Sequence, residues 1–226
     1  FDYAIELSTR PEKRIGDDKL WDKAESILES VLKKKKIKYK LNKGDGAFYG
    51  PKIDFHIKDS LERTWQCATI QLDFAMPERF ELEYTDSNNS AKRPIIVHRT
   101  IYGSFERFIG ILLEHLNGNL PLWLSPIQVR ILNFTDRNTK AAEKILAQLK
   151  EEIPQLRIDT DFRNSTVNDK IRDAEMQKIN YIIVIGDKEE KAKTLAVRER
   201  GTAKPKFGVK LDSLIKDLKE KIEKRV

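Results

Sequence analysis

Three stretches in the first half of the chain combine residue types that could bind a phosphorylated ligand, and the first is centred on His98 and Arg107. His98 stands where an apolar strand at 95–97 ends, and Arg107 lies in the helix that follows. Gly103 and Ser104 open that helix. An arginine one turn into such a helix would hold a planar guanidinium against a phosphate. Taken alone, however, a helix arginine more often faces solvent.

The segment 46–52 is the second candidate, because glycines flank its aromatic pair Phe48 and Tyr49. Such glycines let the backbone approach a ligand closely. Lys52 at the end of the segment can supply a point charge for a phosphate or a carboxylate. An ordinary hairpin turn explains the same pattern equally well.

The segment 64–74 is the third candidate and carries Gln66, Cys67 and Gln71. The two glutamines point to opposite faces of a strand unless a bulge intervenes. If the strand is buried, both amides need hydrogen-bond partners. A lone cysteine in such a strand is usually a small core residue.

The sequence predicts that a sheet and two helices position these three stretches. A helix of about 18 residues should begin after the capping residues Asp17 and Asp18, because apolar residues then recur at helical spacing. Four lysines at 33–36 close it, where cations suit a helix C-terminus. A second helix is expected at 102–115. Strands are expected at 1–7, 38–41, 48–49, 52–57, 64–74, 80–84 and 95–99, with turns at 44–46, 73–77 and 86–91. Many strands joined by short loops predict an antiparallel sheet.

The second half has a different order of elements. Composition changes across 121–126, so we place a domain boundary between residues 124 and 125. Strands that alternate with helices predict a mostly parallel sheet, here with an antiparallel addition. The fold class is therefore α+β for 1–124 and mixed α/β for 125–226. The expected strands are 128–134, 157–162, 181–186 and 194–200, and the expected helices are 140–150, 166–179 and 211–224.

Composition restricts the class of protein further. Hydrophobic residues make up 39% and charged residues 35% of the chain, as in folded globular proteins. The net charge of +7 is compatible with binding a polyanion, but charge alone favours the simpler explanation of a lysine-rich proteome. The single cysteine excludes an internal disulfide and fits a reducing cytosol. No apolar stretch approaches the roughly 20 residues that span a bilayer, and no signal peptide is evident.

In combination, the three candidate stretches resemble class II aminoacyl-tRNA synthetases, and specifically the threonyl-tRNA synthetase family. The matching segments are 7–16, 46–52, 65–74, 98–99 and 103–110, and they occur in family order and at family spacing. The resemblance implies the C-terminal part of a class II catalytic core at 1–124, with an antiparallel sheet and helices. It implies an anticodon-binding domain at 125–226.

The resemblance also implies an ATP-dependent activation of threonine, followed by its transfer to threonine tRNA. Basic groups and the magnesium bound with ATP would offset charge as the threonine carboxylate attacks the α-phosphate. Arg107 would contact the γ-phosphate, and Lys52 and Gln66 would lie at the adenylate. The residues implied at or beside the threonine pocket are Tyr49, Cys67, Gln71, Ser104 and Arg99.

His98 matches a histidine ligand of a catalytic zinc, which would bind the amino and hydroxyl groups of threonine. Such a metal would let the enzyme reject valine, which apolar packing alone discriminates poorly. Neither Cys67 nor His56 nor His115 matches the other ligand positions of the family. One ligand does not hold zinc.

In the second half the resemblance implies that Asn164, Glu189 and Arg198 read the anticodon. These side chains can hydrogen-bond unstacked bases, which is how single-stranded RNA is recognised. Asn164 follows the strand 157–162, at the carboxyl end where α/β sheets usually bind ligands. Contacts to phosphates could come from Lys170, Arg172 and Lys188.

The first two class-defining motifs, which supply the dimer interface and an ATP-binding arginine, would lie upstream of Phe1. We therefore expect this chain alone not to form threonyl-adenylate. Its parent would be a cytoplasmic, homodimeric threonine–tRNA ligase that does not bind membranes. The alternative is a non-catalytic module, derived from a synthetase, that recognises a tRNA-like stem-loop. A prolyl, histidyl or glycyl synthetase is disfavoured by the segments 8–16 and 46–52.

Overall fold

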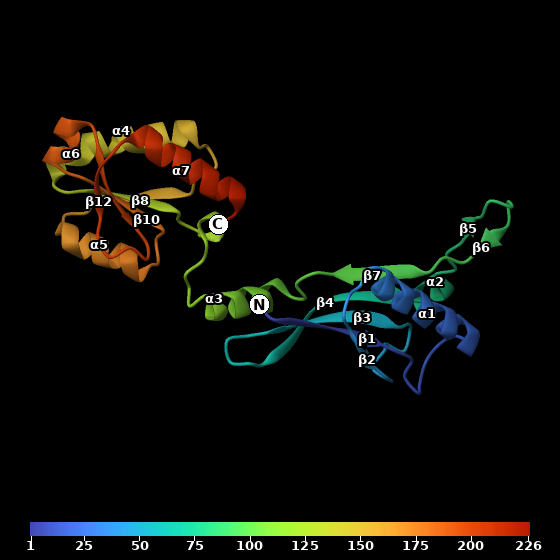
Figure 1. Ribbon diagram of the computed structural model, residues 1–226. Helices are drawn as coiled ribbons and strands as arrows, with labels where there is room; N and C mark the ends of the chain where they lie inside the picture. Colours follow the sequence, from blue (N-terminus) through green and yellow to red (C-terminus); the bar gives the residue numbers. More distant parts are fainter. The chain divides into compact units, whose positions relative to one another are not determined.

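A computed structural model describes all residues, 1–226. The chain divides into two compact units, Phe1–Asn117 and Gly118–Val226 (Figure 1). Each unit has its own sheet and its own apolar core. The boundary expected between residues 124 and 125 stays a prediction. No helix combines the length and the apolar character needed to cross a membrane.

The first unit is built on a five-stranded sheet in the order β2-β1-β3-β4-β7. Only the β1–β2 pair is parallel, so the expected antiparallel sheet is confirmed. Its strands are β1 (Tyr3–Ser8), β2 (Lys40–Asn42), β3 (Lys52–Lys58), β4 (Thr64–Asp73) and β7 (Ile96–Thr100).

One helix, α1 (Asp18–Lys34), covers one face of this sheet. It begins as expected, because the Asp17 carboxylate accepts a hydrogen bond from the Leu20 amide. Its buried residues Leu28 and Leu32 join the core formed by Leu7 and Ile53 of the strands. Alternation along β1 and β3 therefore leaves the opposite face of the sheet to polar residues.

The region after β4 differs from the sequence-based prediction. The expected turn at 73–77 overlaps a short helix, α2 (Ala75–Arg79), which begins there because the Asp73 carboxylate accepts hydrogen bonds from the amides of Ala75 and Met76. The expected strand at 80–84 is replaced by a hairpin of β5 (Tyr84–Thr85) and β6 (Ala91–Lys92). The expected strand at 48–49 is a single bridge between Ala47 and Gly50. Helix α3 (Phe105–His115) begins later than expected because Ser104 caps it.

The second unit is a three-layer α/β structure with a sheet in the order β12-β11-β10-β8-β9. The three strands β9, β8 and β10 are parallel, and β11 and β12 add antiparallel, as the alternation predicted. Helix α6 and strand β12 were not expected. The elements are η1 (Leu122–Leu124), β8 (Val129–Asn133), η2 (Asp136–Asn138), α4 (Thr139–Glu152), β9 (Ile158–Asp161), α5 (Val167–Met176), β10 (Tyr181–Ile185), α6 (Asp187–Ala192), β11 (Leu195–Glu199), β12 (Lys206–Val209) and α7 (Leu211–Lys224).

The central strands of the second unit are buried on both faces, which explains their nearly continuous apolar sequences. Ile131 and Ile183 pack in the cluster that α4 and α7 complete. Leu132 and Ile182 point to the other face, toward α5. Helix α5 therefore lies on one side of the sheet and α4 and α7 on the other (Figure 1).

Candidate functional sites

A row of polar residues crosses the open face of the first sheet. Lys52 on β3 lies opposite Gln71 on β4, and Gln71 lies opposite His98 on β7. Directly opposed residues of an antiparallel sheet project to the same face. The sheet thus brings together three residues that are far apart in sequence and that were all predicted to be site residues.

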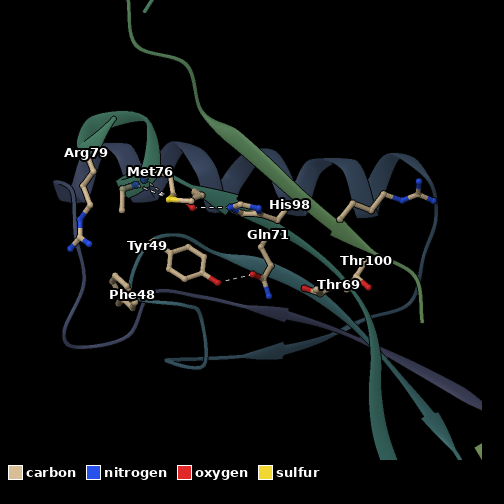
Figure 2. A pocket seen from close by; sticks show the side chains of 11 residues that line it. Phe48, Tyr49, Thr69, Gln71, Met76, Arg79, His98 and Thr100 are labelled. Atoms are coloured by element: carbon tan, nitrogen blue, oxygen red, sulfur yellow. Dashed lines mark hydrogen bonds and ion pairs between the residues drawn. The ribbon is translucent and has the colours of Figure 1, made fainter. Parts of the chain in front are cut away.

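Gln71 and His98 line a cavity of about 580 Å³ together with Tyr49 (Figure 2). The Tyr49 hydroxyl donates to Gln71 Oε1 at 2.8 Å. His98 Nε2 lies 2.8 Å from Asp73 Oδ2. Arg99 also lines this cavity, whereas Cys67 and Ser104 are not among its lining residues.

Asp73 lies at the junction between β4 and α2, where its carboxylate contacts the His98 ring. Burial acts to raise the pKa of this carboxyl, but the Met76 amide, His98 and the Ala75 amide outweigh burial and lower the pKa below its ordinary value. A carboxylate fixed by two amides and contacting a histidine orients the ring and leaves Nδ1 as the other polar atom.

A second buried carboxylate, Asp54, organises the adjacent part of the face. Its oxygens accept from Lys52 Nζ at 2.7 Å and from Gln66 Nε2 at 2.6 Å. Burial acts to lower the pKa of Lys52, but Asp54 and the exposed Asp45 raise it overall, so Lys52 remains a cation. The side chain of Asp54 is 1% exposed and that of Lys52 13% exposed, so this pair is largely withdrawn from water.

A β-bulge explains how the two predicted glutamines of β4 reach one face. The register of β4 against β3 shifts so that Gln66 opposes His56 and Cys67 has no partner. One extra residue reverses the alternation beyond it. Gln66 and Gln71 therefore project to the same side, which a regular strand would not allow.

Arg107 reaches the bulge from helix α3. Its Nη2 donates to the Gln66 carbonyl oxygen at 2.8 Å, and its amide donates to the capping hydroxyl of Ser104. Gly103 has φ +69°, and a Cβ there would lie 2.8 Å from the guanidinium and 3.2 Å from the Cys67 carbonyl oxygen. Glycine at this position is therefore what lets Arg107 lie against β4. Cys67 is buried, and burial raises the pKa of its thiol although Arg107 acts to lower it.

The residues of this chain do not by themselves fit a zinc site. His98 contacts one carboxylate, and no group of three or more His, Cys, Asp or Glu side chains is arranged to hold a metal ion. Cys67, His56 and His115 do not line the cavity with His98.

The second unit has a cavity of about 460 Å³ between α5 and the sheet, at the carboxyl end of β10. Two of the three predicted anticodon residues, Glu189 and Arg198, line it, as does Lys188. Arg198 Nη1 lies 3.3 Å from Glu175 Oε1, and Glu189 Oε2 accepts from the Gly186 amide at 3.2 Å. Apolar side chains from α5 and from the central strands also line it, namely Val167, Ile171, Val184 and Ala196.

The other predicted residues of this unit lie outside the cavity. Asn164 is exposed in the loop between β9 and α5. Lys170 is 2% exposed and donates to Asn133 Oδ1 at 2.6 Å, so the expectation that it contacts phosphates is wrong for this structure. Its position on α5 turns the side chain toward the end of β8 instead of toward solvent. Arg172 is 72% exposed.

Several residues of both sites were missed from the sequence. Asp54 could have been found because it follows Lys52 by two positions on the same strand face. Thr69 lies on that face too, lines the first cavity, and has a buried hydroxyl without a hydrogen-bond partner. Phe134 and Phe207 line the second cavity, and nothing local in sequence connects them.

Comparison with known proteins matches each unit to a family model. Residues 9–116 match the tRNA synthetase class II core domain (G, H, P, S and T), and residues 128–221 match the anticodon binding domain. A threonine–tRNA ligase of Syntrophomonas wolfei is 48% identical over 227 residues, which cover 98% of this chain and 35% of that relative. One of Desulforamulus reducens is 53% identical over 199 residues, which cover 88% of this chain and 31% of that relative.

A solved structure agrees with these matches. The crystal structure of the RNA binding domain of threonyl-tRNA synthetase from Cryptosporidium parvum superimposes with a TM-score of 0.85 at 39% identity. The match covers 97% of this chain and 55% of that chain. This chain thus spans about a third of the length of the curated relatives that it matches.

Proposed function

The chain belongs to the threonyl-tRNA synthetase family, and we propose that it supplies part of the threonine-activating site and the anticodon-reading domain of a threonine–tRNA ligase. The observation that carries the proposal is the row of Lys52, Gln71 and His98 across the open face of the first sheet. Gln71 and His98 line the cavity, and Lys52 lies opposite Gln71 on the same face of the sheet. An amide and an imidazole at a cavity with a cation on the adjacent strand suit a substrate with both anionic and hydrogen-bonding groups.

In this proposal Lys52 and Arg107 stabilise negative charge on the nucleotide. Both are cations held by protein oxygens, Lys52 by Asp54 and Arg107 by the Gln66 carbonyl. Charges that are fixed before the reaction require no reorganisation while charge develops at the phosphate. Gln66, held by the same Asp54, would contact the adenylate.

Threonine would lie in the cavity beside the hydrogen-bonded pair of Tyr49 and Gln71. Because Tyr49 donates to Gln71 Oε1, the amide nitrogen Nε2 of Gln71 is left to donate to the substrate. Ser104 caps the helix that carries Arg107, and Cys67 is the unpaired residue of the bulge, so both would act from outside the cavity.

ATP, magnesium and zinc are proposed for the complete enzyme. A metal bound there would supply a Lewis acid, and His98 is the one residue of this chain that matches a zinc ligand of the family. Further ligands would have to come from residues other than these 226. Assembly as a homodimer and a cytoplasmic location are likewise proposals for the complete enzyme.

In the second unit, Glu189 and Arg198 would read a base of the anticodon at the cavity, and Asn164 a neighbouring base. A carboxylate accepts from base amino and imino groups, while a guanidinium donates to base oxygens and nitrogens. The exposed Lys188 and Arg172 are the cations available to nearby phosphates.

Equilibrium binding to a threonine tRNA transcript and to anticodon-swapped transcripts, at one salt concentration, tests this proposal. Salt is held constant because phosphate contacts make every affinity depend on it. We expect the native anticodon to bind at least about tenfold tighter, and Glu189→Gln or Arg198→Ala to abolish the preference. Equal binding of wild type to all transcripts would remove the anticodon-reading role.

Pyrophosphate exchange tests the part of the proposal that concerns threonine activation. We expect no threonine-dependent exchange from the purified 226-residue chain, because the cations seen here are only part of what this reaction needs. Exchange by the chain alone would contradict this expectation. A longer chain of the same family serves as the positive control.

A further inference from the structure

Two exposed aromatic rings stand at the cavity of the second unit. Phe134 directly follows β8 and is 54% exposed, and Phe207 lies on β12 and is 73% exposed. Both line the cavity with Glu189 and Arg198. Neither ring is paired with another aromatic ring of the chain.

The backbone holds Phe134 at this place. Its amide donates to the Ile185 carbonyl oxygen at 2.9 Å, which ties the end of β8 to the end of β10. Gly186 follows, and a Cβ there would lie 3.4 Å from Phe134 Cβ. The same Cβ would lie 3.0 Å from Glu189 Oε2, so glycine at 186 lets the Glu189 carboxylate lie close to the backbone beside Phe134.

Phe207 comes from the edge strand of the same sheet. Strand β12 pairs with β11, which carries Arg198, and the pairing is irregular between Leu195 and Val197. The ring of Phe207 is therefore accessible from solvent at the edge of the cavity. Pro205, two residues earlier, also lines the cavity.

We propose that Phe134 and Phe207 are base-stacking residues that hold unstacked bases of an RNA loop at this cavity. The inference rests on the proposed anticodon-reading function and adds to it the aromatic surfaces on which the bases would stack. The polar groups of Glu189 and Arg198 can select a base by hydrogen bonds to its edge, but these bonds do not cover the face of the base. Aromatic faces supply that part of single-strand RNA recognition, together with the cations nearby.

A comparison of leucine substitutions tests the proposal on the whole 226-residue chain. Phe134→Leu and Phe207→Leu keep an apolar side chain and remove the ring, and both positions are exposed enough that the fold should tolerate them. We expect each variant to bind a threonine tRNA transcript about 5- to 100-fold more weakly. Phe207→Trp, which keeps an aromatic face, should bind the transcript about as tightly as wild type does. Phe80→Leu is the matched control, since Phe80 is 66% exposed in the first unit and should have no effect.

A thermodynamic cycle distinguishes stacking from an indirect effect. The second change is an abasic nucleotide at each position of the anticodon loop in turn. If a ring stacks on one base, the leucine variant should lose no further affinity for the transcript that lacks that base. Fully additive losses at every position, or unchanged affinity of both leucine variants, would overturn the proposal.

The thermodynamic cycle and the anticodon-swap experiment can refute the stacking residues and the reading function separately. Wild type that prefers the native anticodon, with leucine variants that bind as wild type does, would refute the stacking residues and leave the reading function in place. Coupling to an abasic position without anticodon preference would support stacking and refute the reading function.

Discussion

At the scale of single residues, two buried carboxylates determine the geometry of the candidate catalytic face. Asp54 fixes Lys52 and Gln66, and Asp73 fixes His98. Neither aspartate was among the residues selected from the sequence. The spacing of Asp54, two positions after Lys52 on β3, could have indicated it, whereas the contact of Asp73 with His98 depends on the pairing of β4 with β7. The residues that the two carboxylates orient could be found, since the family resemblance identified them by position.

Substituting Asp54 should therefore destabilise the first unit as well as disturb the site. Asp54→Ala leaves the Lys52 ammonium largely buried without its close partner, a loss of about 3 kcal/mol in the free energy of unfolding. Urea unfolding followed by tryptophan fluorescence measures it. Asp45→Asn is the control, because Asp45 lies 3.3 Å from the same ammonium but is 56% exposed. Removing that exposed partner should cost about 1 kcal/mol or less, and equal losses in the two variants would contradict the assigned role of Asp54.

At the scale of elements, the sequence predicted most of the strands and helices but not the irregularities that position the site. The order of strand and helix in the second unit follows from apolar periodicity, and the structure confirms it. The bulge at Cys67 and the helix after Asp73 depend on pairing with β3 and on the side chain of Asp73. Periodicity along one strand does not contain this information, because it arises from contacts between elements. The same holds for Lys170, whose burial depends on Asn133 of another strand.

The hairpin between β3 and β4 illustrates how one residue can hold an element. The Asp59 carboxylate accepts from the amides of Leu61 and Arg63, from Arg63 Nε and from Trp65 Nε1. Burial acts to raise the pKa of Asp59, but these bonds outweigh it and hold the pKa well below the ordinary range. A carboxyl with a lower pKa in the folded state favours folding when it is ionised.

The first unit should accordingly lose stability in acid. The contribution of Asp59 is complete above its ordinary pKa of about 3.9 and declines as the pH falls through that value toward the lower folded pKa. Asp59→Asn should be less stable than wild type at neutral pH, and the difference should shrink between about pH 5 and pH 3. Urea midpoints across this range measure it. Glu62→Gln, an exposed change in the same turn, should follow the wild-type profile. A constant difference between Asp59→Asn and wild type at every pH would show that ionisation of Asp59 is not involved.

At the scale of the whole molecule, the chain contains two separate cores with different chemistry beside them. The first core lies under α1, and the second fills both faces of a five-stranded sheet. A unit with its own buried core can fold as one cooperative body. Each family model also matches within one of the units, at residues 9–116 and 128–221.

We therefore predict that residues 118–226 fold alone and keep the RNA-binding properties of the chain. Ile131, Ile183 and Leu218 are fully buried within this unit, so its core needs no residue from the first unit. The isolated unit should unfold in one cooperative transition and bind threonine tRNA with the anticodon preference of the whole chain. Ile131→Ala should lower its free energy of unfolding by about 2–5 kcal/mol through the cavity that it creates. The same substitution in the 226-residue chain should leave the unfolding of the first unit unchanged, as hydrogen exchange of β3 and β4 can show. A disordered isolated unit, or a loss of protection in both units of the Ile131→Ala chain, would mean that the two cores are energetically coupled.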